Sequence, residues 1–268
     1  MFSSILVAVD LSTAADRALP LAGALARHGA LPIELLTVVP PGTTGVRPEE
    51  LDERVRQLGL GSHRSLVVED DDPATAIADH VRGRDGALLV MATTAKSALD
   101  ETHGGSVSEH VLSASGQPVL LVGPRVDVDR PRSTLSLVVA VDASDLAAAA
   151  LPVIVSWVRA FGAGPVTAVQ VIPLVPAIAE QAGPALEATH VRRYAERLGE
   201  LGVAAGGAVV HGGDPVAGLI EAAGAVADPV LVVTAEPWAD AGTHWRSTSR
   251  KLAYRSTGPV LVVPATES

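Results

Sequence analysis

Residues 92–108, ATTAKSALDETHGGSVS, are the part of the chain best suited to hold a phosphate. The segment follows the apolar run ALLVM and precedes an expected helix, and backbone N–H groups at a helix start bind anions. Gly105 and Ser106 offer donors there. Ala92 and Ala95 stand where such a loop would need glycine, because glycine permits positive φ and a close approach of the backbone to the ligand. The segment therefore has the outline of a phosphate-holding loop in which alanine replaces glycine.

Other residues capable of catalysis or metal binding lack the necessary spacing. Glu69–Asp72 form a row of four carboxylates, but adjacent acids on an exposed turn seldom converge on one ion, so we expect a solvated loop. No two histidines lie four residues apart around a glutamate. Asp100, His103 and Ser106 lack the G-x-S-x-G frame of a hydrolase, and there is no Walker motif. We expect no catalytic residue and no metal site.

The composition favours a soluble globular protein. Hydrophobic residues make up 48% of the 268 residues and the mean hydropathy is +0.33, which excludes disorder. The longest apolar run, around residues 147–158, is interrupted by Pro152 and Ser156 and is shorter than the ~20 residues of a membrane span. The net charge of −10 opposes binding to nucleic acid or anionic lipid. With no cysteine and no basic leader after Met1, the cytoplasm is the expected location.

The chain contains the same pattern twice. ILVAVDLS, beginning at Ile5, recurs as LVVAVDAS, beginning at Leu137, an offset of 132 residues. ALP recurs with the same offset, and VVEDDDPATAI and QPVLLVGP recur in the same order as VVHGGDPVAGLI and GPVLVVPA. We therefore predict two domains, residues 1–124 and 134–268, joined by a polar, proline-containing linker at 125–133.

Within each copy, short runs of Val, Leu and Ile alternate with longer stretches of helical period. This alternation is typical of βα units around a parallel sheet whose strands are buried on both faces. The strands expected in the first copy are Ser4–Val9, Ile33–Val38, Arg64–Val68, Ala87–Met91 and Pro118–Val122. In each copy an Asp-Pro pair combines a capping oxygen with the fixed φ of proline, which marks the start of a helix.

These features together resemble the universal stress protein family. VAVD closes the first strand, DP opens the third helix, and GSVS precedes the last helix and the strand PVLLV. The resemblance covers both copies, nearly the whole chain. It implies an α/β fold of two tandem doubly wound (Rossmann-like) domains, each a five-stranded parallel sheet of order 3-2-1-4-5. Any ligand would lie at the carboxyl ends of strands one and four, where the order reverses.

The resemblance also implies a nucleotide site in the first domain. Nucleotide-binding members have, after the fourth strand, Gly, two residues, Gly, nine residues, then Gly and Ser or Thr. This chain keeps the spacing, with Ala92 and Ala95 at the first two glycine positions and Gly105 and Ser106 at the last two. The candidate nucleotide-binding residues are Ala8, Val9, Asp10, Val38, Met91, Ala92, Ala95, Gly105, Ser106, Val107 and Ser108.

The sequence leaves two possible effects of Ala92 and Ala95 on nucleotide binding. At positive φ each alanine costs ~1 kcal/mol or more, whereas at negative φ its methyl group only crowds the ligand. The acidic run Glu69–Asp72 stands where the second copy has the glycines of HGGDP, and it would repel a triphosphate unless a divalent cation intervened.

The second domain departs further from the pattern. It has no glycine at the first two positions, its loop is shorter, and Arg246 stands in place of the third glycine. Arg246 could contact a phosphate and Trp238 or Trp245 could stack on a base, but a tryptophan-rich loop at a sheet edge is more often a packed lid. The weaker candidates in this domain are Asp142, Arg246, Ser247 and Ser249.

We expect a non-enzymatic stress-response or regulatory protein that acts through an unknown protein partner. It needs no cofactor, and ATP or another adenine nucleotide would bind weakly at a degenerate site in the first domain. One alternative is an ATP sensor; another, a nucleotide hydrolase or phosphotransferase, is disfavoured because neither copy has a recognisable base, metal pair or nucleophile. We expect neither nucleic acid nor a membrane as partner. The two copies should pair through their last strands as an intramolecular pseudo-dimer, and whole chains could dimerise in addition.

Overall fold

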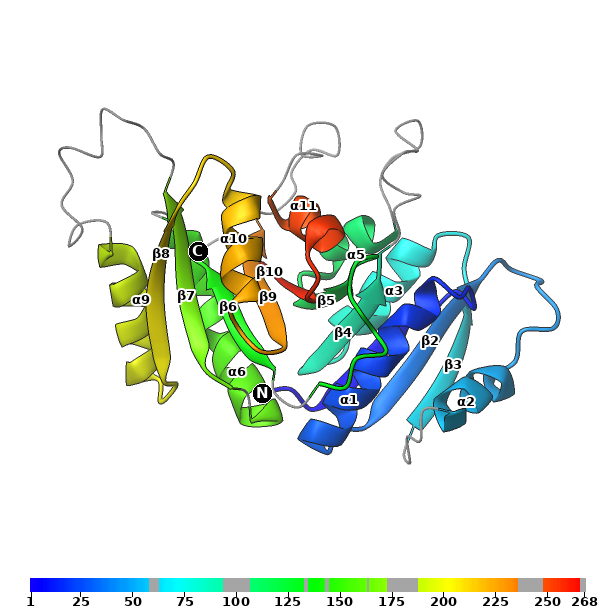
Figure 1. The fold of residues 1–268 in the computed structure, drawn as a ribbon. Coiled ribbons are helices and arrows are strands. Elements are labelled where there is room, and N and C mark those ends of the chain that lie inside the picture. Colours follow the sequence, from blue (N-terminus) through cyan, green and yellow to red (C-terminus); the bar gives the residue numbers. More distant parts are fainter. Residues whose placement is uncertain are drawn as a thin grey trace.

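A computed structural model describes residues 1–57, 63–93, 107–132, 135–142, 145–162, 164–172, 188–235 and 248–265 (Figure 1). The first half contains β1 (Ser4–Ala8), the 3-10 helix η1 (Ala15–Ala18), α1 (Leu19–Gly29), β2 (Ile33–Val39), α2 (Pro48–Gln57), β3 (His63–Glu69), α3 (Pro73–Arg82), β4 (Ala87–Ala92), α5 (Val107–Ser115) and β5 (Val119–Val122). The second half contains β6 (Ser136–Ala140), the 3-10 helix η2 (Asp145–Ala150), α6 (Leu151–Phe161), β7 (Val166–Ile172), α9 (Thr189–Glu200), β8 (Ala205–His211), α10 (Pro215–Gly224), β9 (Pro229–Ala235), α11 (Thr248–Arg255) and β10 (Val260–Pro264).

The ten strands found in the described residues form one sheet, in the order β3-β2-β1-β4-β5-β10-β9-β6-β7-β8. Every pairing inside a half is parallel. The halves meet where β5 pairs antiparallel with β10, with Leu120 opposite Leu261. The α/β class and the pairing of the last strands within the chain are therefore confirmed. The domain boundaries and the dimerisation of whole chains stay predictions.

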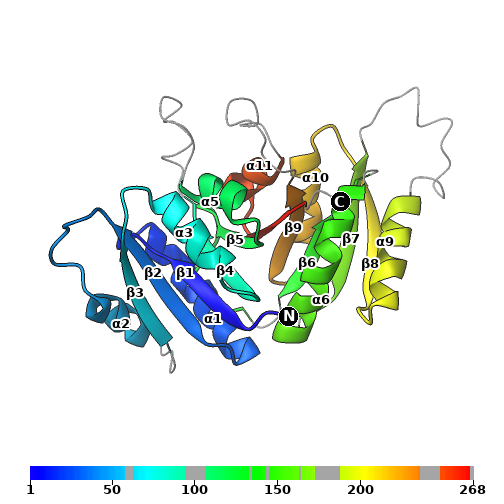
Figure 2. The same cartoon turned by 180° about the vertical axis from the view of Figure 1, so that it is seen from behind.

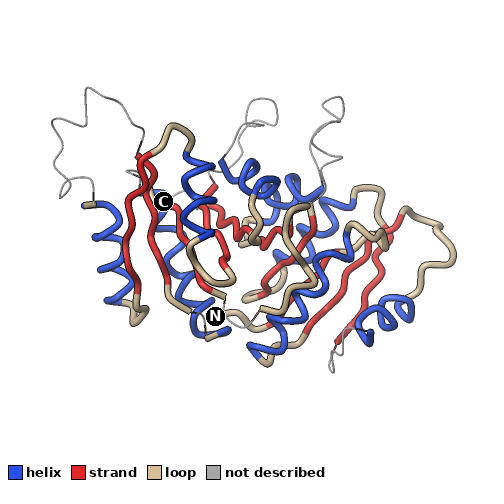
Figure 3. Tube along the Cα trace, viewed as in Figure 1, coloured by secondary structure: helices blue, strands red, loops and turns tan. Residues whose placement is uncertain are grey.

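The strands inside the sheet are largely buried on both faces, whereas the edge strands β3 and β8 are half-buried or exposed. Alternate side chains of a strand belong to two different hydrophobic clusters. One cluster lies under α1, α2, α6 and α9, and the other lies under α3, α5, α10 and α11. Figure 3 shows the resulting arrangement of a sheet covered by helices on both sides. In β1, for example, Ile5 and Val7 belong to the first cluster and Leu6 to the second.

An aromatic cluster provides a second contact between the halves. The ring of Phe2, before β1, lies with its centroid 6.4 Å from that of Trp157 in α6, in an edge-to-face arrangement. The Trp157 ring in turn lies 4.8 Å from Phe161, and Trp157 is fully buried. Figure 2 shows the N-terminus beside α6. The amino end of the first half is therefore fixed to a helix of the second.

The third contact between the halves is formed by α5 and α11, which lie side by side (Figures 1 and 2). Glu109 and Arg250 form an ion pair, with Oε1 and Nε 2.9 Å apart and both side chains almost fully buried. The Thr93 and Tyr254 hydroxyls are hydrogen bonded at 3.1 Å across the same boundary.

The Asp-Pro pairs begin helices as expected. Asp72 accepts hydrogen bonds from the backbone N–H groups of Ala74 and Thr75 and from the Thr75 hydroxyl, and this bonding lowers the pKa of its carboxyl group. Asp214 caps α10 in the same way and also pairs with Arg255 of α11. The same sequence device therefore sets the same helix start in both halves.

Candidate functional site

The candidate site lies where the strand order reverses, at the carboxyl ends of β1 and β4. Ala8 and Met91 are paired neighbours on these two strands, and both are buried together with Val9. Asp10 follows directly and is exposed, and Val38, near the end of β2, is half-buried. The structure thus brings the first five candidate residues to one edge of the sheet.

The loop after β1 is held in a defined shape. The Asp10 carboxylate accepts a hydrogen bond from the Ser12 backbone N–H at 2.9 Å, and Leu11 adopts a left-handed φ of 63°. Arg54 of α2 donates to the Leu11 carbonyl oxygen at 2.9 Å and pairs with the Asp16 carboxylate. The position of Asp10 at the site therefore depends on a helix two strands away.

Ala92 is the last residue of β4, where it pairs with Val122 and packs against the hydrophobic cluster on the α1 side. Among the described non-glycine residues, positive φ occurs at Leu11, Ala30 and Asp228, so Ala92 has an ordinary strand backbone. Of the two consequences left open for the alanines, backbone strain therefore does not apply at this position. The effect that remains is the volume of its methyl group at the end of β4.

The first turn of α5 lies at the boundary between the halves. Val107 is 43% exposed, but Ser108 is buried and lines a small cavity of about 10 Å³ together with Ser249, Arg250 and Tyr254. The candidate serines of the two copies thus share one cavity between α5 and α11.

Of the remaining candidate residues, the structure describes only Asp142. Asp142, which follows β6, is exposed. Ala95, Gly105, Ser106, Arg246 and Ser247, as well as Trp238 and Trp245, lie outside the described residues.

Comparison with known proteins places the first half in a family. Residues 1–123 match the model of the Universal stress protein family. These residues belong to the universal stress protein family. No curated protein is similar enough in sequence to count as a match.

Solved structures extend the likeness to the second half. A universal stress protein from Archaeoglobus fulgidus DSM 4304 covers 98% of this chain and 97% of its own length, with a TM-score of 0.69 and 18% identity. A protein from Pseudomonas aeruginosa UCBPP-PA14 covers 98% of this chain and 93% of its own length, with a TM-score of 0.64 and 16% identity. At these identities the likeness concerns the fold, which is shared over both halves.

Carboxylates of the acidic run Glu69–Asp72 accept backbone hydrogen bonds in turns and at a helix start. Glu69 accepts a hydrogen bond from the Gly42 N–H, Asp70 accepts one from the Asp72 N–H, and Asp72 caps α3. Three strand spacings, about 14 Å, separate β3 from β4, which exceeds the screening length of about 8 Å in physiological salt. The repulsion of a phosphate at β4 is therefore weaker than the sequence suggested. Among the described residues, no group of three acidic or histidine side chains could hold a metal ion.

Within the described residues, no helix is long and apolar enough to cross a membrane.

Arg54 contacts the loop of the candidate site, and the sequence did not predict this contact. The sequence shows Arg54 only as one of several charges on an amphipathic helix. Its contact with the loop after β1 requires α2 to pack near η1, on the same face of the sheet as α1. No spacing rule connects positions 54 and 11, so the sequence contains no signal for this contact.

Proposed function

We propose that this chain is a non-enzymatic stress-response protein that regulates a protein partner, and that its first half retains only a weak site for an adenine nucleotide. The observation that carries the proposal is the environment of Ser108, a candidate phosphate donor in the first turn of α5. Its side chain is buried beside Ser249, at the boundary with the other half. A hydroxyl group in this position serves the contact between the halves more readily than a phosphate.

The residues at the nucleoside end of the site support the proposal that some affinity for an adenine nucleotide is retained. Asp10 is exposed at the reversal of the strand order, and Arg54 fixes the backbone beside it. A carboxylate at this place can accept a hydrogen bond from a sugar hydroxyl or a base amine. Val38 is half-buried nearby and offers an apolar surface to a base.

The phosphate end supports the weakness of binding. The methyl group of Ala92 adds bulk at the end of β4, and Ala95 adds a second methyl group in the loop that follows. Each removes space or backbone freedom that a close phosphate contact needs. A penalty of ~1 kcal/mol at Ala95, a smaller steric one at Ala92 and the loss of the Ser108 hydroxyl would together lower the affinity tenfold or more.

An ATP sensor is the second candidate, because the spacing from Ala92 to Gly105 and Ser106 is that of nucleotide-binding members. A hydrolase or phosphotransferase is less favoured because the sequence offers no recognisable general base or nucleophile beside the loop.

Mass spectrometry of the small molecules released on denaturing the purified chain separates these candidates. We expect no stoichiometric nucleotide, since a ligand bound this weakly is lost during purification. The control is the same measurement after incubation with excess ATP and rapid desalting. A full complement of ATP carried through purification would contradict the proposed function and favour the sensor. Steady-state phosphate release above background would instead favour the hydrolase.

A further inference from the structure

An apolar groove of about 600 Å³ lies where the start of α6 meets the end of β10 and the turn between α5 and β5. Its lining is dominated by small and aliphatic residues, among them Leu146, Ala148, Pro152, Val153, Val263 and Pro264. Pro152 is exposed and Val153 is half-buried. The groove thus presents aliphatic surface at the junction of the two halves. Residues 143–144 and 266–268 lie outside the described residues.

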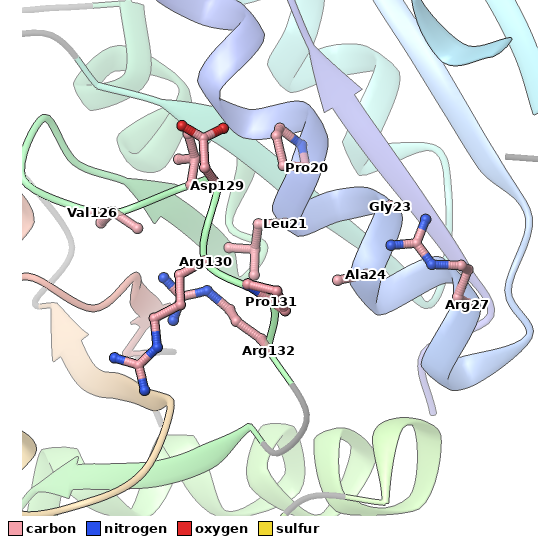
Figure 4. A pocket seen from close by; sticks show the side chains of 11 residues that line it. Pro20, Leu21, Gly23, Ala24, Arg27, Val126, Asp129, Arg130, Pro131 and Arg132 are labelled. Carbon is pink, nitrogen blue, oxygen red and sulfur yellow. The ribbon is translucent and has the colours of Figure 1, made fainter. Parts of the chain in front are cut away.

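The sequence repeat gives this groove a counterpart in the first half. With the offset of 132 residues, Pro152 and Val153 correspond to Pro20 and Leu21 at the start of α1. There residues 126–132 of the linker run beside the helix (Figure 4). Leu21 is consequently only 3% exposed. Among the described residues, this helix face is covered in the first half and uncovered in the second.

The covering segment is held by two kinds of contact. Val126 is 3% exposed and Val128 packs partly buried against the same core, so two aliphatic side chains separated by one residue face the protein. Arg17 donates hydrogen bonds to the carbonyl oxygens of Gly123, Pro124 and Val126, at 3.4, 3.3 and 2.6 Å. The occupant of the first groove is therefore a Val-x-Val segment with its backbone anchored by an arginine.

We propose that the groove beside α6 binds a segment of a partner protein with the same chemistry, two aliphatic side chains separated by one residue. The linker of this chain cannot supply it, because Arg17 already holds that segment on α1, and the same holds for the linker of any second copy. Ala149 occupies the position of Arg17, so the affinity depends on the aliphatic contacts. The inference rests on the proposed function only for the existence of a protein partner.

A labelled peptide with the linker sequence GPRVDVDR, residues 123–130, is the probe, and fluorescence anisotropy of its titration with the full chain is the measurement. We expect saturable binding, and none for a peptide with serine in place of both valines. Val153→Glu should weaken binding about tenfold or more, because it places a charge in the aliphatic groove. Leu201 is an aliphatic residue that is 45% exposed and does not line the groove. The control variant Leu201→Glu should therefore leave binding unchanged.

Ala149→Arg provides a test that does not depend on a disruptive substitution. It supplies the guanidinium that Arg17 uses in the first half, so peptide binding should become several-fold tighter. No binding of the peptide up to about 1 mM, or equal binding by the wild type and by Val153→Glu, would overturn the proposal. A chain dimer that Val153→Glu dissociates in sedimentation would also overturn it, since the groove would then serve a second copy. The nucleotide measurements are independent of these outcomes, so the two failures can be told apart.

Discussion

Gly123→Ala should destabilise the chain by about 3 kcal/mol or more and lower its melting temperature by roughly 10 °C. Gly123 follows β5, where the chain passes the backbone of α11. A Cβ atom there would lie 1.8 Å from the carbonyl oxygen of Ala253, far inside van der Waals contact. Because that oxygen belongs to a helix backbone, it can move only if α11 shifts away from β5. Thermal unfolding followed by circular dichroism measures the effect.

Gly213→Ala is the matched control. This glycine has open space around its Cβ position and is not in the left-handed region, so the substitution should change the melting temperature by no more than about 2 °C. Equal stability of Gly123→Ala and the wild type would show that β5 and α11 do not approach as closely as described.

Glu109→Arg should lower the free energy of unfolding by about 3–5 kcal/mol, because it places two arginines together in a mostly buried contact. The double variant Glu109→Arg/Arg250→Glu should recover most of the loss. Unfolding in denaturant for both single variants and the double variant yields the coupling energy. Arg56 and Glu53, an exposed ion pair on one helix, provide the control, and the same exchange there should change stability by less than about 1 kcal/mol.

This ion pair also distinguishes the two halves. Glu109 and Arg250 occupy the same position in the repeat, each nine residues before the proline that precedes the last strand. Two first halves paired in the same way would bring two glutamates together, whereas unlike halves form an attractive pair. If the double variant were no more stable than the less stable single variant, the pair would not contribute to the contact between the halves.

The repeats made much of the fold predictable. Apolar runs and the Asp-Pro helix starts indicated the strands and several helix boundaries, and the expected strand Pro118–Val122 begins only one residue later in the structure, at Val119. The pairing of the last strands followed from the cost of leaving two apolar edges unpaired. These features are local, or follow from one general rule, and so can be read from the sequence.

The contacts that join separate elements were not predictable. Glu109 and Arg250 are 141 residues apart, and their pairing depends on how α5 and α11 cross the boundary between the halves. The roles of Arg54 at the loop after β1 and of Arg17 at the linker likewise follow from packing. For the candidate site, the sequence identified the edge of the sheet but not the backbone of Ala92, which needs the observed strand to exclude positive φ.

Calorimetric titration of ATP into the wild-type chain and into the double variant Ala92→Gly/Ala95→Gly measures the nucleotide affinity of the first half and the effect of the two alanines on it. We expect the wild type to bind too weakly to saturate at micromolar ATP, and the double variant to recover part of the affinity. At Ala92 the gain would come from removing a methyl group rather than from relieving a strained backbone. Micromolar binding by the wild type, unchanged in the double variant, would show that these alanines do not obstruct a nucleotide and that the site is not degenerate.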